Sequence, residues 1–237
     1  MALLQRYHLD LSTEGSAPTV DHVYGLLLRL LGPALERQPG ATKPLSLVSE
    51  PDGGFAIGAL SAPIVAALDQ LAQLPPMQVP LGSGTGTLQS VRPLDPTPLP
   101  YQALFAAEAP PGRLTFRFLT PVCIKQGREE FLFPDPVTVF GALLQRHNAH
   151  SPYPFPPDMA GDFRHLRITQ YRLQTRSVPF LTHRVTGFVG QATYRLPPDL
   201  PPQVAYLATA LARFAVYSGV GARTHLGLGH ALLQEER

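Results

Sequence analysis

The 27 prolines of this 237-residue chain mark the ends of its helices and strands. Proline removes a backbone hydrogen-bond donor and fixes its own φ, so it belongs at the boundaries of regular elements. Between these boundaries, some stretches have apolar residues at every third or fourth position and others are β-branched, aromatic runs typical of strands. The pattern predicts a chain in which short strands and helices alternate.

Residues 1–105 show the order strand, helix, strand, strand, helix, strand. The expected elements are a strand at 2–9, a helix at 20–31, strands at 43–50 and 55–60, a helix at 63–74, and extended segments at 77–81 and 87–95. Thr19 and Asp21 provide N-cap chemistry for the first helix, and Gly32-Pro33 ends it. This order is ferredoxin-like, with two helices on one face of an antiparallel sheet.

Residues 106–237 repeat the order. The expected elements are a strand at 113–121, a helix at 136–148, strands at 164–178 and 184–196, a helix at 202–217 and a strand near 230–233. The sequence therefore predicts an α+β protein of two tandem ferredoxin-like (RRM-like, βαββαβ) domains, 1–105 and 106–237. A glycine-rich loop precedes the last strand of the second domain.

Composition narrows the class of protein. Hydrophobic residues make up 44% of the chain and charged residues 15%, which indicates a folded protein. No apolar run is long enough to cross a bilayer, and the start of the chain has no signal-peptide pattern, so we expect a cytoplasmic protein without a membrane partner. The single cysteine, Cys123, excludes an internal disulfide and a multi-cysteine metal site. We expect neither a metal nor a cofactor.

The cations are distributed unevenly, although the formal net charge is only +2. Between Phe163 and Pro198 there is no acidic residue, and six arginines fall in this stretch: Arg164, Arg167, Arg172, Arg176, Arg184 and Arg195. A GC-rich genome would explain why arginine replaces lysine, but not why the acids are absent. The stretch predicts a surface that contacts a phosphate backbone, and Tyr171 within it could stack on a base.

A second motif follows the last predicted helix. Gly219, Gly221, Gly227 and Gly229 have the spacing G-x-G-x5-G-x-G. Glycine permits a positive φ and lets backbone amides approach a phosphate closely. The motif is neither a Rossmann fingerprint, which lies between a strand and the following helix, nor a P-loop, which requires Gly-Lys-Ser/Thr. Taken alone, it is equally typical of a flexible turn.

In this context the motif resembles the glycine-rich loop of the RAMP superfamily of CRISPR-associated proteins. Within that superfamily the chain resembles the endoribonucleases that process CRISPR repeat RNA. Further similar stretches are Lys43–Ser49, Thr120–Lys125, Phe133–Phe140 and Phe188–Tyr194. The resemblance implies binding of CRISPR repeat RNA and metal-independent cleavage of precursor crRNA for antiviral defence. In that reaction the 2′-hydroxyl attacks the adjacent phosphate, which leaves a 2′,3′-cyclic phosphate (or 3′-phosphate) and a 5′-hydroxyl.

The resemblance implies an active site containing a histidine, often a tyrosine, and a lysine. Many relatives carry the histidine in the loop after the first helix, but residues 34–42 of this chain contain none. The expected catalytic residues are therefore His22 as general base, Tyr24, and Lys43 as the group that stabilises the transition state. Exposed or packing roles for these three side chains stay open.

RNA contacts are expected from the first helix, the basic strands and the glycine-rich loop. The expected RNA-binding residues are Arg29, Arg164, Arg167, Arg172, Arg176, Arg184, Gly219, Gly221, Arg223, His225, Gly227 and Gly229. CRISPR interference-complex subunits and a second copy of the chain stay open as further partners. The main alternative function is a non-catalytic RNA-binding RAMP subunit of an interference complex. A small two-His-motif phosphoesterase and a protein-interaction module also stay open.

Overall fold

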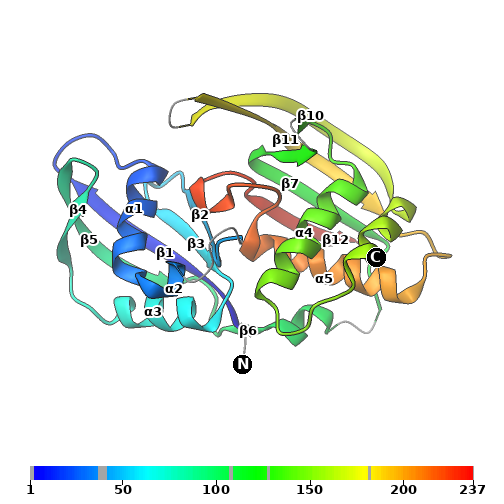
Figure 1. Cartoon of the computed structure of the whole chain (residues 1–237), viewed down its shortest axis with the longest axis horizontal. Helices are drawn as coiled ribbons and strands as arrows, with labels where there is room; N and C mark the ends of the chain where they lie inside the picture. The colour runs from blue at the N-terminus through cyan, green and yellow to red at the C-terminus, as the bar shows by residue number, and fades with distance from the viewer. Residues whose placement is uncertain (1–2, 37–41, 107–108, 127–128, 181–182, 237) are drawn as a thin grey trace. The chain divides into compact units, whose positions relative to one another are not determined.

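The computed structural model describes residues 3–36, 42–106, 109–126, 129–180 and 183–236. The chain divides into two compact units (Figure 1). Unit 1 comprises Met1–Pro100 with His225–Gly227, and unit 2 comprises Tyr101–Thr224 with Leu228–Arg237. The predicted domain boundary after residue 105 falls at the C-terminal end of η1, a short 3-10 helix at Tyr101–Phe105. Within the described part of the chain, no helix has the length and apolar character needed to span a membrane.

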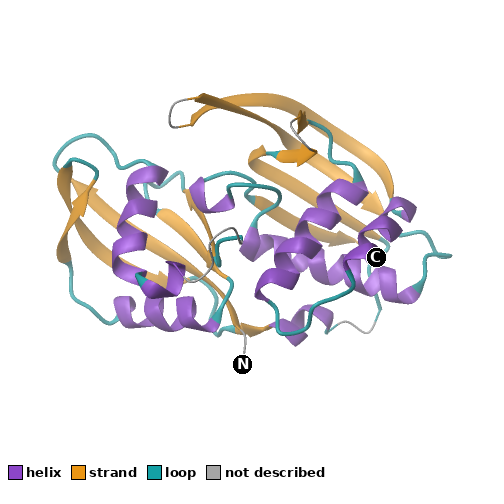
Figure 2. Ribbon diagram, viewed as in Figure 1, coloured by secondary structure: helices purple, strands orange, loops and turns teal. Residues whose placement is uncertain are grey.

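Unit 1 has a six-stranded antiparallel sheet with helices on one face (Figure 2). Its elements are β1 (Leu3–Thr13), α1 (Val20–Leu31), α2 (Pro33–Glu36), β2 (Leu45–Ser49), β3 (Phe55–Ala59), α3 (Ala62–Ala72), β4 (Met77–Leu81), β5 (Gly84–Pro93) and β6 (Leu99–Pro100). The order in the sheet is β2-β3-β1-β5-β4, and β6 pairs with the start of β1. The ferredoxin-like prediction is confirmed, with β4 added as an edge strand.

Helix α1 forms where the apolar period and the cap residues agree. The Thr19 hydroxyl accepts a hydrogen bond from the backbone N–H of His22, and Gly32 ends the helix at a φ of 40°. Its buried residues, Val23, Leu26, Leu27 and Leu31, enter the core of unit 1 beside strand residues such as Leu9. Burial of each such aliphatic side chain contributes roughly 1.5–3 kcal/mol, so packing against the sheet holds this 12-residue helix in place.

Unit 2 repeats the arrangement with a four-stranded antiparallel sheet. Besides η1, its elements are β7 (Arg113–Val122), β8 (Ile124–Gln126), β9 (Glu129–Phe131), α4 (Pro136–His150), η2 (Pro157–His165), β10 (Arg167–Phe180), β11 (His183–Arg195), α5 (Pro202–Ser218) and β12 (Ala231–Glu236). The sheet order β10-β11-β7-β12 is that of a ferredoxin-like fold. Helices α4 and α5 cover one face (Figure 1), where Phe140 of α4 packs against Phe116 of β7 and Tyr194 of β11.

One predicted boundary is wrong. We expected a strand to begin at Arg164, but Arg164 and His165 lie in the 3-10 helix η2, and β10 begins at Arg167. The cause is the fully buried ring of Phe163, which packs on Phe140 of α4, together with the hydrogen bond from the Leu166 N–H to the Phe163 carbonyl, which holds Arg164 and His165 in the turn. Arg164 is therefore an exposed residue outside the sheet.

The core of unit 2 contains a buried histidine, His147, that should make stability depend on pH. Four aromatic rings lie with their centroids within 6.3 Å of its own: Tyr101, Phe105, Phe155 and Phe214. Burial lowers the pKa of His147, and a hydrogen bond with Asn148 offsets this only in part. Because the unfolded chain then binds the proton first, stability is lost as the pH falls below the ordinary histidine pKa of about 6.5.

We therefore expect a lower thermal unfolding midpoint at pH 5.5 than at pH 7.5. The His147→Phe variant, which keeps an aromatic ring in the core, should show a smaller difference between the two pH values. Midpoints followed by circular dichroism would measure this. An equal pH dependence in the two proteins would show that other groups cause it.

Candidate nucleic-acid interface

The face of the unit 2 sheet opposite the helices carries a cross-strand row of polar side chains. Arg117 of β7 pairs with Gln191 of β11, which pairs with Arg172 of β10. Successive residues of a strand point to opposite faces, so the buried neighbours Phe116 and Phe118 face the helices and the exposed Arg117 faces away from them. The two arginines stand two strands apart, about 10 Å, on the face opposite the described helices α4 and α5.

This row borders a hollow of about 450 Å³. Its lining includes Arg117, Arg172 and Arg176, with the amide side chains of Gln174 and Gln191 between them. Among the described residues that line it, none is acidic. Three guanidinium groups without a neighbouring carboxylate form a surface suited to binding several phosphates of one nucleic-acid strand.

A β-bulge in β11 shapes the hollow. Gly190 has a φ of 120°, and the pairing of β11 with β7 shifts register between Phe188 and Gly190. A Cβ on Gly190 would lie 2.1 Å from the carbonyl oxygen of Arg172, so only glycine permits this approach of β10 to β11. Such a bulge bends its strand and redirects the side chains beside it.

The other predicted arginines do not join this cluster. Arg167 lines a separate hollow of about 300 Å³ together with Asp199. Arg184 donates hydrogen bonds to the hydroxyl and carbonyl oxygens of Ser177, at 3.2 and 2.8 Å. Arg29 is exposed in the last turn of α1, in unit 1. Their roles in RNA binding stay predictions.

Sequence reasoning missed Arg117. Its signal was a cation in the middle of the apolar strand residues 114–119, where alternation alone places it on the face opposite Phe116. Tyr171, which we expected to stack on bases, is 63% exposed on β10, and its ring meets Phe133 nearly at right angles, with centroids 5.7 Å apart. Tyr171 and Arg172 are consecutive in β10, so by strand alternation their side chains lie on opposite faces of the sheet.

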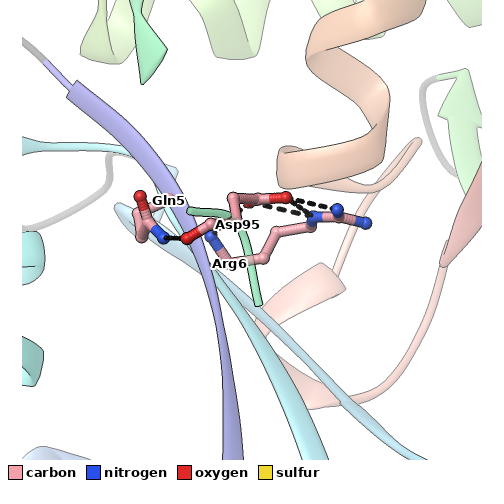
Figure 3. A network of polar contacts seen from close by, with 3 residues as sticks. All are labelled: Gln5, Arg6 and Asp95. Carbon is pink, nitrogen blue, oxygen red and sulfur yellow. Dashed lines mark hydrogen bonds and ion pairs between the residues drawn. The ribbon is translucent and has the colours of Figure 1, made fainter. Parts of the chain in front are cut away.

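Not every cation near a strand is available to a ligand. In unit 1 the guanidinium and backbone N–H of Arg6 bind the carboxylate of Asp95, just after β5 (Figure 3). The side chain of Gln5 donates to the backbone carbonyl of the same aspartate at 2.8 Å. These bonds join β1 to the chain that leaves β5, so Arg6 has a structural role.

The glycine-rich loop has a defined conformation. Its four glycines, Gly219, Gly221, Gly227 and Gly229, have φ values from 68° to 87°, in the region that favours glycine. Backbone hydrogen bonds hold the loop: Val220 N–H to Gly229 O, Ala222 N–H to Cys123 O and Gly229 N–H to Pro121 O, at 2.8–2.9 Å. Arg223 has a φ of 60°, the one positive φ among non-glycine residues of the described chain.

Residues 225–227 of this loop belong to unit 1, where they pack on helix α1. The ring of His225 lies 4.9 Å from that of Tyr24, centroid to centroid, with a tilt of 54°. Gly227 is so close to Val20 that a Cβ would lie 3.1 Å from the valine side chain. Burial raises the pKa of Tyr24, which keeps its phenol protonated at neutral pH.

His22 faces a different part of unit 1 from Tyr24. A Cβ on Gly82, which follows β4, would lie 2.7 Å from Nε2 of His22. Side chains two positions apart in a helix point in directions about 200° apart, which explains why His22 and Tyr24 face different parts of unit 1. Lys43 is partly buried two residues before β2. Of the expected catalytic residues and loop contacts, the structure thus brings Tyr24 together with His225.

Among the described residues, one group of side chains could hold a metal ion. His8, Glu50 and Asp52 offer ligand atoms within 4.8 Å of one another, and Nδ1 of His8 lies 2.6 Å from a carboxylate oxygen of Glu50. Two carboxylates and one imidazole are common ligands, but the His8–Glu50 contact is also an ordinary hydrogen bond between β1 and the turn before β3. The expectation that the chain needs no metal stays a prediction.

Comparisons with known proteins agree on one family. The family model for CRISPR-associated endoribonuclease Cas6 matches residues 116–231. A CRISPR-associated endoribonuclease Cas6 of Mycobacterium tuberculosis is 30% identical over 155 residues, which are 64% of this chain and 49% of the relative. One of Streptococcus thermophilus is 27% identical over 139 residues, 56% of each chain. The match thus spans about half the length of these curated relatives.

Solved structures extend the similarity to the whole fold. A Cas6 product complex has a TM-score of 0.82 and 27% identity, with 98% of this chain and 100% of that chain covered. A Thermus thermophilus Cas6 has a TM-score of 0.77 and 25% identity, with 99% of each chain covered. The tandem ferredoxin-like units of this chain are thus also the fold of these CRISPR-associated proteins. The chain is therefore similar to the Cas6 family in sequence over residues 116–231 and in fold over nearly its whole length, and the predicted resemblance is confirmed.

Proposed function

We propose that this chain binds CRISPR repeat RNA and cuts precursor crRNA. The carrying observation is the hollow of unit 2, where Arg117, Arg172 and Arg176 gather on an open sheet face without an acidic neighbour among its lining residues. That surface suits a phosphate backbone. Similarity to Cas6 endoribonucleases in sequence and fold supports the proposed class of RNA and the proposed cleavage.

The proposed reaction is metal-independent transesterification. The 2′-oxygen attacks the adjacent phosphorus, the bond from phosphorus to the 5′-oxygen breaks, and the products are a 2′,3′-cyclic phosphate (or 3′-phosphate) and a 5′-hydroxyl. One proton leaves the 2′-hydroxyl and one joins the leaving 5′-oxygen, so the site needs a base, an acid and positive charge near the phosphate. We assign the positive charge to Lys43 and a hydrogen-bond donor role to Tyr24. His22 is the base expected from the sequence.

A cleavage assay in EDTA tests this proposal. Wild-type protein would be mixed in excess with a labelled repeat RNA from the source genome, with and without a single 2′-deoxy substitution at the cleavage site. We expect cutting in EDTA, a cyclic phosphate or 3′-phosphate end, and no cutting above background of the deoxy substrate. A deoxy substitution three nucleotides away is the matched control and should still be cut.

A second candidate function is a non-catalytic RNA-binding subunit. The observation that favours it is the absence of histidine from residues 34–42, five of which, 37–41, lie outside the described residues. Tight binding of the repeat without cutting, in EDTA and in added Mg²⁺ or Mn²⁺, would support this function. Cutting only with added metal would overturn the metal-independent mechanism and direct attention to His8, Glu50 and Asp52.

A further inference from the structure

The proposed reaction requires a group that accepts the proton of the 2′-hydroxyl near neutral pH, and the assignment of that group rests on the proposed function. Histidine is the side chain whose ordinary pKa suits this role. Two of the chain's histidines are engaged elsewhere: His8 pairs with Glu50, and His147 is buried among aromatic rings in the core of unit 2. His22 faces Gly82.

His225 stands out because it contacts Tyr24, the other residue expected to act on the RNA. The two rings are 4.9 Å apart and both side chains are partly exposed, so a substrate group can reach the pair. We infer that His225 is a catalytic residue of this chain and that it forms a proton-transfer pair with Tyr24. In this pair the imidazole takes the proton from the 2′-hydroxyl as the oxygen attacks phosphorus. The bond from phosphorus to the 5′-oxygen breaks, and the leaving 5′-oxygen takes a proton from solvent water. The phenol donates a hydrogen bond to the phosphate as negative charge develops there.

The loop holds His225 in a fixed position. Gly227, two residues further on, has a φ of 87° and packs against Val20 of α1, and the glycines on either side of the loop tip are also held at positive φ. Arg223, two residues before the histidine, is held at a φ of 60°, a conformation that few non-glycine residues adopt. A catalytic group gains most from such a preset geometry, because less ordering is needed when the substrate binds.

The environment of Tyr24 decides which member of the pair is the base. Because burial raises the pKa of Tyr24, its phenol keeps its proton at neutral pH and is not a base for the 2′-hydroxyl, although it can donate a hydrogen bond. The imidazole of His225 is then the group of the pair that can accept a proton. This division of roles explains how the chain could cleave RNA with no histidine in residues 34–42.

The test is single-turnover cleavage by full-length variants, with RNA binding measured separately and the reaction repeated in added imidazole. For His225→Ala we expect a loss of at least about 100-fold in the cleavage rate with little change in RNA affinity. Free imidazole should restore part of the rate. Tyr24→Phe, which removes only the phenol hydroxyl, should slow cleavage by about 10-fold. His150→Ala, at the end of α4, is the control and should cleave at the wild-type rate.

Each outcome decides the inference. A normal rate for His225→Ala, or loss of cutting in His22→Ala alone, would show that His225 is not the base, while the proposed function would stand. A slow His225→Ala variant that imidazole does not rescue, with or without weaker RNA binding, would assign His225 a structural or binding role and overturn the inference. Binding without cutting by the wild-type protein would instead remove the proposed function itself.

Discussion

Replacement of Gly229 by alanine should lower the free energy of unfolding by roughly 3 kcal/mol, the cost of a strained backbone position made worse by overlap. Gly229 has a φ of 69°, and a Cβ there would lie 2.0 Å from the carbonyl oxygen of Val220. That oxygen belongs to the backbone of the loop, and the loop cannot move away cheaply. Gly229 itself accepts a hydrogen bond from Val220 N–H and donates one to Pro121 O.

Urea unfolding followed by circular dichroism would measure the loss, since the chain has no tryptophan. Gly15→Ala is the matched control. It makes the same chemical change at a glycine where the added methyl group would meet no heavy atom within 4 Å and where φ is not positive, and it should change stability by less than about 0.5 kcal/mol. Equal stabilities of the two variants would mean that the loop is flexible and that its glycines are not required by its conformation.

The second large effect is expected on RNA binding. The triple substitution Arg117→Ala, Arg172→Ala and Arg176→Ala should weaken the affinity for repeat RNA by on the order of 100-fold at low salt, since each removes a charge-assisted contact to phosphate. Each neutralised phosphate of a single strand contributes about 0.7 to the slope of log affinity against log salt concentration. We therefore expect the magnitude of that slope to fall by about 2 in the triple variant.

Fluorescence anisotropy with labelled repeat RNA over a range of NaCl concentrations would measure both quantities. Arg113→Ala is the control, because Arg113 lies on the same strand as Arg117 but its guanidinium faces the carboxylate of Glu236, 3.9 Å away. It should change the affinity by less than about 3-fold, as exposed ion pairs contribute little. If the triple variant keeps the wild-type slope, the phosphates bind elsewhere, and Arg167 and Arg184 become the next residues to test.

The Gly229 and arginine predictions concern two different features of the chain, the glycine-rich loop and the hollow of unit 2. The arginines of β7 and β10 should determine how tightly RNA is held, whereas Gly229 belongs to the loop that carries His225. The triple arginine variant should therefore bind RNA weakly but cleave the bound RNA at a near-normal rate. Substitution of His225 should have the opposite effect.

Local patterns in the sequence determined the elements and their order. The apolar period of residues 23–31, with Thr19 before it and Gly32 after it, predicted α1 to within a residue, because capping and amphipathicity act over only a few neighbours. The order of strands and helices then predicted two ferredoxin-like units, since short connections leave few ways to pair these strands. The glycine spacing likewise predicted a loop with positive φ.

Only the tertiary structure decided which side chains meet. Arg117 and Arg172 are 55 residues apart and become neighbours of one hollow through the register of β7, β11 and β10. Tyr24 and His225 are about two hundred residues apart in the chain, and no local pattern relates them. Pairing register and loop packing depend on the free energy of the whole fold, so a sequence pattern can show that a residue is available for a site but not which residue it will face.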